Sequence, residues 1–353
     1  MTLKYQRQQD TCAIIFLQIH VLQRSHRKTL WNTDTWEYFP LIKHIQRLGF
    51  NSEIMTVSAL GDFQELQLVD KGMFDKFSRV DPPRASEYTF TNLFMWRRKY
   101  NPKWAVSDDC LLIILEESGG KLLALQPIGS GNKVAAIDTL SRVFLAEGLT
   151  PVIGRVTDDF IESFVDCSRF DLIEDPNNSD YVYQAEKLIS LSGNKYHRKK
   201  NHLNRFMRNY DFEYQAFSID LIDNVLSLQE TWCEFRDCYE DDNLFHEDRA
   251  VCEALSHFQA LSFSGGAILI DGQVQAFSFG EMLNPDTAVI HIEKANPEIE
   301  GLYTAINQQF CAATWSHAKF INREQDLGLE GLRKAKQSYY PHHMVNKWTI
   351  QMR

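Results

Sequence analysis

The stretch GGAILIDGQVQAFSFG, residues 265–280, decides the fold more than any other part of the sequence. Two apolar runs flank Asp271-Gly272, a dipeptide that tolerates positive φ at both central positions of a hairpin turn. Asn284-Pro285-Asp286 then turns the chain into TAVIHIEKA, residues 287–295. We therefore predict three successive antiparallel strands.

The residues around this meander alternate between helical and strand patterns. A strand at 212–218 and helices at 220–236 and 246–259 come before it. After it, Asn296-Pro297 is expected to start a helix, because Asn caps free amides and Pro fits the first helical position. That would place Glu298 and Glu300 in the first turn. A short strand at 319–323, a helix at 329–339 and a strand at 344–351 end the chain.

The earlier part of the chain shows a looser version of the same order. It reads as a hairpin at 110–127, a helix at 132–147, a strand at 151–155, a helix at 157–167 and strands near 170–174 and 181–184. The composition changes around Ser192-Gly193-Asn194. We predict an α/β (α+β) fold of two related halves, each a mixed, mostly antiparallel sheet flanked by helices. Residues 1–60 are read as an N-terminal extension, 61–190 as the first half and 191–353 as the second half with the active site.

Composition narrows the class of protein. The 353 residues carry a net charge of -10, which excludes a generally basic protein that coats nucleic acid. Apolar runs are too short for a transmembrane helix. Seven cysteines without a C-x-x-C pair favour a reducing, cytoplasmic location and disfavour a disulfide framework. Cys233 and Cys238 lack metal-ligand spacing, as do His342 and His343, so no metal site is expected. Met55 is a candidate start, which would make residues 1–54 an extension.

Three segments resemble a known family: FTNLFMWRRKY (90–100), GNKYHRKKNHLNRF (193–206) and INREQDLGLEGLRKAKQSYYP (321–341). Together they are similar to the soluble family related to the C-terminal domain of phosphatidylglycerol lysyltransferase, which has tandem GNAT-like halves. The resemblance covers about residues 63–353. Lys200 stands where it leads us to expect an arginine, which would change bidentate phosphate geometry.

The resemblance implies a transferase that moves an activated acyl or aminoacyl group onto an amine or hydroxyl. Aminoacyl-tRNA and acyl-coenzyme A are the possible donors, and a small molecule or a lipid headgroup is the possible acceptor. No stable membrane insertion is expected, and the oligomeric state stays open. The alternatives are a coenzyme A-dependent N-acetyltransferase and a non-catalytic module that binds a phosphorylated ligand or RNA.

The segment 195–208 is the first candidate site. It has six Lys or Arg residues, Lys199 and Lys200 among them, and no acidic residue. With Asn201 these side chains can hold the phosphates of a tRNA, a coenzyme or a lipid headgroup. The alternative is a solvated helix face.

The strand 287–295 and the residues after it are the second candidate. Alternation would place Val289, His291 and Glu293 on one face, and Glu293 is a candidate general base or a structural ion-pair partner. Asn296 and Gly301 would bind the donor at the start of the next helix. Glu298 and Glu300 would repel a pyrophosphate there, so we expect coenzyme A to bind weakly at this point.

The segment 322–339 is the third candidate. Arg323 can pair with a carboxylate or phosphate, and Glu324 can orient the acceptor amine. Arg333 and Lys336 follow on a helix, and Tyr339 is a candidate proton donor to the departing group or an aromatic core residue. The alternative is that Asp326 caps the helix and Arg323 and Glu324 pair with neighbours. We expect Lys199, Lys200 and Arg323 to border one groove.

Gln126-Pro-Ile-Gly129-Ser-Gly131 is a literal match to a phosphate-binding loop in the first half. Its glycines would let backbone amides approach a phosphate closely. An ordinary turn between a strand and a helix explains the same pattern.

Overall fold

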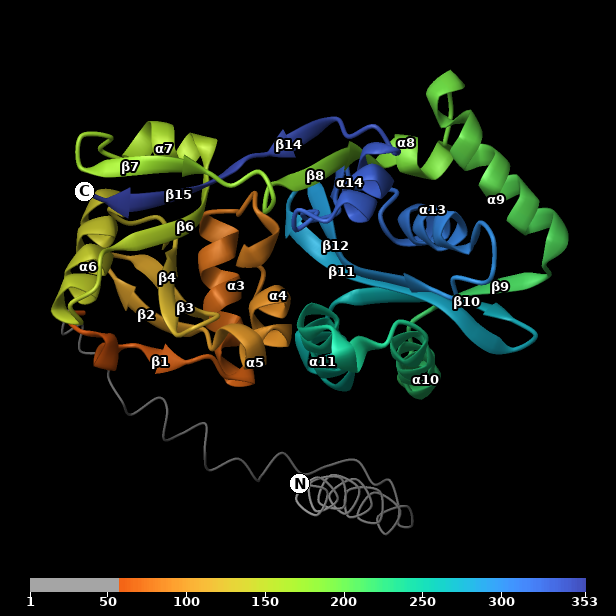
Figure 1. Cartoon of the computed structure of the whole chain (residues 1–353), viewed down its shortest axis with the longest axis horizontal. Coiled ribbons are helices and arrows are strands. Elements are labelled where there is room, and N and C mark those ends of the chain that lie inside the picture. The colour runs from red at the N-terminus through yellow and green to blue at the C-terminus, as the bar shows by residue number, and fades with distance from the viewer. Residues whose placement is uncertain (1–56) are drawn as a thin grey trace, which may run out of the picture. The chain divides into compact units, whose positions relative to one another are not determined.

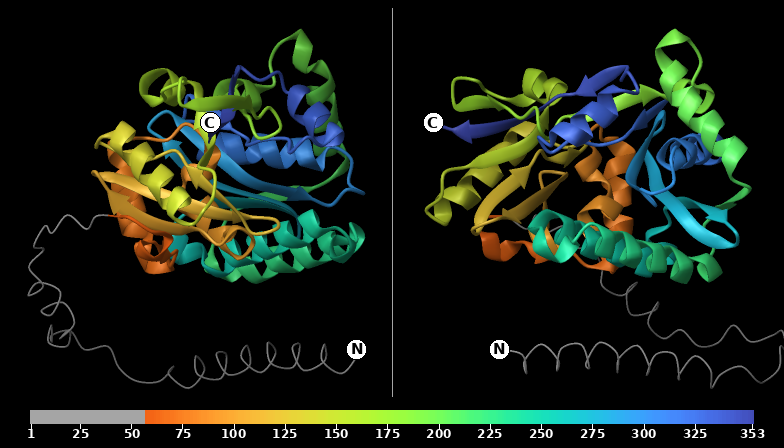
Figure 2. Two further views of the ribbon diagram at one scale, coloured as in Figure 1. Left: turned by 60° about the vertical axis from the view of Figure 1, so that its left-hand side comes forward. Right: turned by 45° about the vertical axis from the view of Figure 1, so that its right-hand side comes forward.

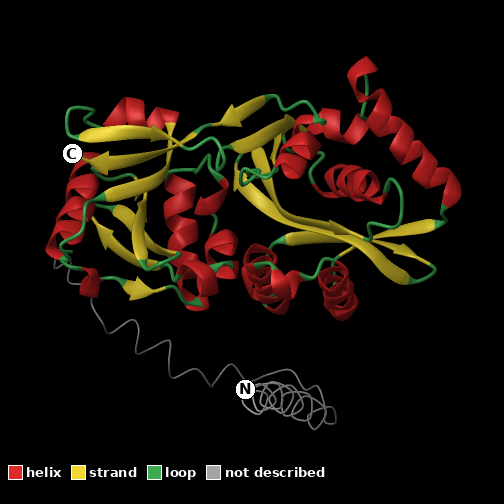
Figure 3. Cartoon of the chain, in the orientation of Figure 1, coloured by secondary structure: helices red, strands yellow, loops and turns green. Residues whose placement is uncertain are grey.

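A computed structural model describes residues 57–353 (Figure 1), so residues 1–56 of the predicted N-terminal extension, Met55 among them, lie outside the part described, whereas Val57 packs in the core of the first half. The chain forms two mixed sheets flanked by helices, so the predicted mixed α/β class with two sheets is confirmed (Figure 3). Within residues 57–353, no helix is long and apolar enough to cross a membrane.

The first sheet has the order β1-β2-β3-β4-β6-β15-β7, and β5 pairs with β3. Its strands are β1 (Gln64–Glu65), β2 (Lys103–Ser107), β3 (Cys110–Glu117), β4 (Lys121–Leu125), β5 (Ile128–Gly129), β6 (Val152–Thr157), β7 (Phe170–Glu174) and β15 (Lys347–Met352). Its helices are α3 (Lys71–Val80), α4 (Phe90–Met95), α5 (Arg97–Tyr100), α6 (Lys133–Ala146) and α7 (Asp158–Phe164).

The second sheet has the order β14-β8-β13-β12-β11-β10-β9. Its strands are β8 (Asp180–Gln184), β9 (Phe212–Ala216), β10 (Ser264–Ile270), β11 (Gln273–Asn284), β12 (Thr287–Ala295), β13 (Phe320–Asn322) and β14 (His343–Val345). Its helices are α8 (Ala185–Ser190), α9 (His197–Asn209), α10 (Ile219–Phe235), α11 (Asp242–Ser256), α12 (Phe258–Leu261), α13 (Leu302–Thr314) and α14 (Glu330–Gln337). The pair β10 and β11 is antiparallel across Asp271-Gly272, as predicted. Helices α10 and α11 cover one face of this sheet and α13 covers the other (Figure 1).

The boundary predicted near residue 190 does not separate the two sheets. Strand β8, assigned to the first half from its position in sequence, pairs with β13 and β14 in the second sheet. Strand β15, predicted to close the second half, returns to the first sheet between β6 and β7. The apolar pattern of a strand predicts which of its residues are buried. Which strands pair when they are far apart in the sequence depends on tertiary packing, which this pattern does not contain.

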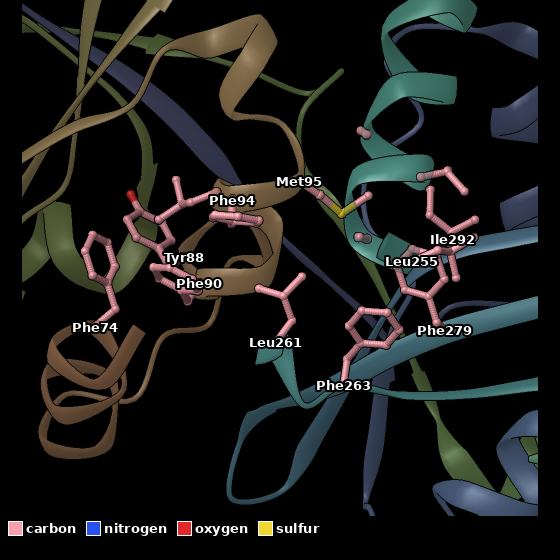
Figure 4. Close-up of a cluster of buried hydrophobic side chains, with 14 of the residues drawn as sticks. Phe74, Tyr88, Phe90, Phe94, Met95, Leu255, Leu261, Phe263, Phe279 and Ile292 are labelled. Atoms are coloured by element: carbon pink, nitrogen blue, oxygen red, sulfur yellow. The ribbon is translucent and has the colours of Figure 1, made fainter. Parts of the chain in front are cut away.

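One apolar core joins the two sheets. Phe74, Tyr88 and Phe90 from the first half pack in the same cluster as Leu255 and Phe279 from the second (Figure 4). The family segment 90–100 forms α4 and α5 at this contact, so its aromatic residues serve the packing of the two halves.

A β-bulge changes the direction of the side chains along β12. Phe279 pairs with Ile292 and Gly280 pairs with Ile290, which leaves His291 as an extra residue. As a result, Ile290 packs in the core on the α13 side, whereas Ile292 packs on the α10 side. The prediction that His291 and Glu293 share a face is therefore wrong.

The bulge requires a glycine on the neighbouring strand. A Cβ built on Gly280 would clash with the Val289 carbonyl oxygen, because the backbones approach closely there. We expect Gly280→Ala to lower the melting temperature, by about 2–4 °C for each kcal/mol of stability that the clash removes. Gly331→Ala is the matched control, since Gly331 lies in helix α14 with open space around it. Equal melting temperatures for the two variants, measured by circular dichroism, would contradict the role of Gly280.

The helix after β12 starts later than predicted. Residues 296–301 form turns, and α13 begins at Leu302 with Gly301 in the left-handed conformation at φ 87°. Glu298 and Glu300 are therefore outside the helix, and Glu300 pairs with Arg205 at 2.8 Å. A Cβ on Gly301 would clash with the His202 carbonyl oxygen of α9, so this glycine allows α9 to pack against the start of α13.

Cys233 and Cys238 form a disulfide, with their Cα atoms 5.1 Å apart. The cysteine pattern did not predict this bridge, which joins two cysteines only five residues apart. Helix α10 ends at Phe235, and Asp237 adopts the left-handed conformation at φ 50°. This turn brings the two cysteines together.

Candidate functional site

The strands β12 and β13 separate at the centre of the second sheet. They pair in parallel only where Thr287–Val289 face Phe320–Asn322. Strand β12 continues to Ala295, whereas the chain leaves β13 at Arg323. Beyond this pairing the two strands are no longer hydrogen-bonded to each other, and side chains from β12, α13 and the segment after β13 meet in the region between them, here called the opening.

An ion pair crosses the opening. Arg323 Nη2 donates to Glu293 Oε1 at 3.0 Å, and Asn307 Nδ2 of α13 donates to Glu293 Oε2 at 2.8 Å. The side chains of Glu293 and Arg323 are 12% and 14% exposed. Glu293 therefore holds Arg323 and Asn307 in fixed positions, with part of the pair still open to solvent.

Two polar atoms beside this ion pair have no protein partner. Arg323 Nη1, a donor, and Asn307 Oδ1, an acceptor, are both buried without a hydrogen bond in the part of the chain that the structure describes. A buried polar group without a partner costs free energy. Arg323 Nη1 and Asn307 Oδ1 are therefore the unsatisfied donor and acceptor beside the ion pair.

Tyr339 forms one wall of the site. Lys199 Nζ lies 4.0 Å from the centre of its ring, and the Arg323 guanidinium carbon lies 4.7 Å from it. Burial raises the pKa of Tyr339 to about 12, so its hydroxyl keeps its proton at neutral pH. Burial lowers the pKa of Lys199 to about 8, and the nearby Arg323 charge acts in the same direction.

The comparisons with known proteins bear on this fold. The profile of the family "Phosphatidylglycerol lysyltransferase, C-terminal" matches residues 79–351. The chain belongs to this family. The resemblance stated from the three sequence segments is confirmed.

Solved structures agree with this assignment. A conserved protein of unknown function from Bacteroides thetaiotaomicron is 34% identical, covers 82% of this chain and 99% of its own, and has a TM-score of 0.78. L-PGS from Bacillus licheniformis is 13% identical, covering 80% of this chain and 92% of its own, with a TM-score of 0.57. FemX is 8% identical, covering 81% and 96%, with a TM-score of 0.54. The chain shares the fold of these structures.

An uncharacterised protein of Mycoplasmoides gallisepticum is 24% identical over 190 residues, which are 52% of this chain. The match spans 60% of that protein, less than two thirds of its length.

The residues of the family segment 321–341 do not all lie in the opening. Arg323 enters the opening, whereas Arg333 Nε donates to Asp326 Oδ2 at 2.7 Å. This contact and a hydrogen bond from Tyr181 lower the pKa of Asp326 to about 2. Lys336 is buried, and its Nζ donates to the backbone carbonyls of Arg323 and Glu324. Arg333 and Lys336, predicted to bind the donor, thus hold the segment that carries Arg323.

Glu324 contacts a buried histidine. Its Oε1 lies 2.8 Å from Nδ1 of His291, whose Nε2 lies 3.0 Å from Glu281 Oε1. Asn92 Nδ2 of α4 donates to the same Glu324 oxygen at 3.1 Å, and Thr89 Oγ1 lies 3.5 Å from His291 Nε2. The carboxylate expected to orient the acceptor amine therefore lies in a charged cluster where the two halves meet.

This cluster predicts a pH-dependent stability. The two carboxylates raise the pKa of His291 from 6.5 to about 9 against the opposing effect of burial. A raised pKa in the folded state gives a contribution that is complete below pH 6.5 and is lost as the pH rises through about 9. We expect His291→Gln to cost on the order of 3 kcal/mol at about pH 6 and much less at about pH 9.5.

Guanidinium titrations of the wild type and the variant at both pH values measure this difference. His317→Gln is the control, because His317 is exposed. A cost for His291→Gln that is equal at the two pH values would mean that His291 is not charged in the folded protein.

The basic segment forms α9, which lies along the outside of the second sheet (Figure 2). Lys200 and Asn201 are exposed, whereas Lys199 is half-buried against Tyr339. The structure therefore brings Lys199 and Arg323 to one ring, and Lys200 follows Lys199 on the solvent side. Their binding role stays a prediction.

Asn296 forms two hydrogen bonds with Gln275 of β11. Its backbone N–H donates to the Gln275 carbonyl at 2.9 Å, and its Nδ2 donates to Gln275 Oε1 at 3.0 Å. Gly301 packs against α9, as described above. Sequence reasoning missed Asn307, the third member of the ion-pair cluster, which no motif in the helical pattern of α13 distinguishes from core residues.

The glycine loop of the first half holds an internal carboxylate. The Gly129 N–H donates to Asp81 Oδ2 at 3.0 Å, and Lys133 Nζ donates to the same atom at 2.5 Å. A Cβ on Gly131 would clash with the Asp108 carbonyl oxygen. Asp81 therefore takes the position and the partners that a phosphate would need, which favours the plain turn. No cluster with metal-ligand geometry occurs among residues 57–353.

Proposed function

We propose that the protein transfers an aminoacyl or other acyl group from an activated ester to an amine or hydroxyl acceptor. The observation that carries this proposal is the unpartnered pair in the opening, the donor Arg323 Nη1 and the acceptor Asn307 Oδ1, held in place by Glu293. An aminoacyl ester matches both, because its carbonyl oxygen accepts a hydrogen bond and its α-amine donates one.

The position and the positive charge of α9 favour a polyanionic donor. It begins next to the opening, and its exposed basic residues follow one another on the outside of the sheet. The charge of Arg205 is partly neutralised by Glu300, whereas Lys200 is exposed to solvent. The acceptor stem of an aminoacyl-tRNA would meet these charges while its aminoacyl end reaches Arg323. Acyl-coenzyme A is the second possible donor.

The chemistry requires one bond to form and one to break. The acceptor nitrogen or oxygen forms a bond to the carbonyl carbon of the donor, and the ester C–O bond breaks. Arg323 stabilises the negative charge that develops on the carbonyl oxygen. Glu293 accepts the proton of the attacking group directly or through water, and Tyr339 gives a proton to the departing oxygen. Tyr339 regains that proton from solvent, and Lys199 adds a positive charge over its ring.

The acceptor is expected to be a small molecule or a lipid headgroup that carries an amine or hydroxyl. The family name specifies lysyl transfer to phosphatidylglycerol for the proteins that gave the family its name, and the reaction of this chain is a proposal. The coenzyme A-dependent acetyltransferase receives less support, because Asp81 fills the glycine loop and α9 packs against the start of α13.

The salt dependence of tRNA binding tests the donor. We expect Lys199→Ala/Lys200→Ala to weaken binding of fluorescein-labelled deacylated tRNA and to reduce the slope of log K against log salt by about 1–2 between about 50 and 200 mM KCl. Thermal stability should change little. Fluorescence anisotropy measures the binding.

The matched control is Lys76→Ala/Arg79→Ala, which removes two exposed positive charges from α3 in the first half. If both double variants reduce the slope equally, the protein attracts tRNA by its overall charge and α9 is not the donor site.

A further inference from the structure

A second site lies on the α10 face of the sheet, away from the opening. It is a cavity of about 370 Å³ between α10, the start of β11 and the residues that follow β12. The Glu293 side chain contacts α13, on the other face. The cavity is large enough for a small organic ligand.

The lining of this cavity is polar but almost uncharged. Asn224, Ser227 and Thr231 lie along the outer side of α10, with Gln273 and Gln275 opposite them. The amides both donate and accept hydrogen bonds, whereas the hydroxyls of Ser227 and Thr231 donate to backbone carbonyls of α10 and can accept from a ligand. Glu298 is the one charged residue of the lining, and no Lys, Arg or His contributes to it. The lining itself therefore holds no positive charge, and the nearest cations, Lys294 and Arg236, lie by the ring of Trp232.

The floor of the cavity is apolar and rigid. Leu228, Trp232 and Val274 are buried and line it. The Trp232 indole N–H donates to the Tyr303 hydroxyl at 3.1 Å, and Lys294 Nζ lies 3.4 Å from the ring centre. The indole is thus fixed on α13 and β12, with Lys294 over one face of its ring, and the rest of its surface borders the cavity.

We propose that this cavity binds a neutral sugar unit. A sugar has an apolar C–H face and a rim of hydroxyls that donate and accept at once, which matches a fixed indole surrounded by amides and hydroxyls. A peptide would instead need an extended row of backbone partners, and the cavity offers side chains from three separate segments. The proposal stands independently of the transferase activity.

The test uses the full-length protein labelled with 5-fluorotryptophan and followed by ¹⁹F NMR. The Trp232 resonance is assigned with Trp232→Phe. The probes are glucose, galactose and N-acetylglucosamine, with glucose 6-phosphate, glucuronate and N-acetyl-triglycine amide beside them. We expect a saturable shift of the Trp232 resonance with a neutral sugar at a Kd on the order of 1 mM, and at least about tenfold weaker binding of the two anionic sugars.

Two variants locate the binding. Ser227→Tyr fills the cavity and is expected to abolish the shift, and Asn224→Ala, at an exposed position, is expected to weaken it about tenfold without affecting folding. Asp223→Ala and Glu230→Ala, on α10 but outside the lining, are the controls and should leave it unchanged.

Three outcomes would overturn the proposal: no shift with any neutral sugar, a shift that persists in both cavity variants, or tighter binding of the peptide amide than of the sugars. Loss of tRNA binding in the α9 variants would not affect this result, so the two proposals fail separately.

Discussion

Lys347→Met is expected to lower the free energy of unfolding by about 3–5 kcal/mol. Lys347 Nζ lies 2.6 Å from both Glu87 Oε2 and Asp180 Oδ1, and its side chain is fully buried. Asp180 is buried as well, on β8 of the second sheet, whereas Lys347 belongs to β15 of the first. Removing the ammonium would leave Asp180 without a counter-charge beside Glu87, which keeps Arg155 at 3.5 Å, at the point where the two sheets exchange strands.

Guanidinium denaturation at neutral pH measures this effect. Lys71→Met is the control, because Lys71 pairs with Asp75 at 2.7 Å in a partly exposed helical pair, which contributes less than about 1 kcal/mol. Similar losses in the two variants would mean that the buried cluster does not hold the sheets together.

Arg323→Gln is expected to remove the preference for an aminoacylated donor. An arginine that donates to the carbonyl of a bound ester in a partly buried site contributes about 1.5–3 kcal/mol, or about 10–100-fold in affinity. We expect this loss for tRNA that carries a non-hydrolysable, amide-linked aminoacyl group, and little change for deacylated tRNA, whose phosphates we propose that α9 binds. Fluorescence anisotropy with the two tRNAs separates the effects.

Arg333→Gln is the matched control, from the same family segment. Arg333 pairs with Asp326 outside the opening, so this variant should lose stability while it keeps the preference. If Arg333→Gln removes the preference and Arg323→Gln does not, the donor lies on the outer side of α14.

The sequence was sufficient where a local signal determines the structure. Asp271-Gly272 between apolar runs predicted the hairpin of β10 and β11, and the segment 321–341 identified the family and contains Arg323. The segment 195–208 stands out by its composition alone, because it has six positive charges in an acidic chain. Its predicted helix is α9, His197–Asn209.

Sequence reasoning failed where packing determines the structure. The bulge at His291 inserts one residue into β12, and a period of two cannot detect it. Without the bulge, the alternating pattern places His291 on the same face as Glu293. The sequence therefore could not show that His291 joins Glu281 and Glu324 in a separate cluster. Asp81 lies 48 residues before Gly129, so the glycine pattern alone could not show that the loop holds a carboxylate.

The position of a donor's aminoacyl group in a crystal structure tests the proposed site most directly. The ligand is an aminoacyl-adenosine with a 3′-amide in place of the ester, which cannot transfer its group. We predict that its carbonyl oxygen accepts a hydrogen bond from Arg323 Nη1 and that its α-amine lies against Asn307 Oδ1 and Glu293, between β12 and β13. An aminoacyl group found only at the glycine loop of the first half or in the cavity beside α10, with Arg323 and Asn307 left without a ligand, would contradict the proposed site.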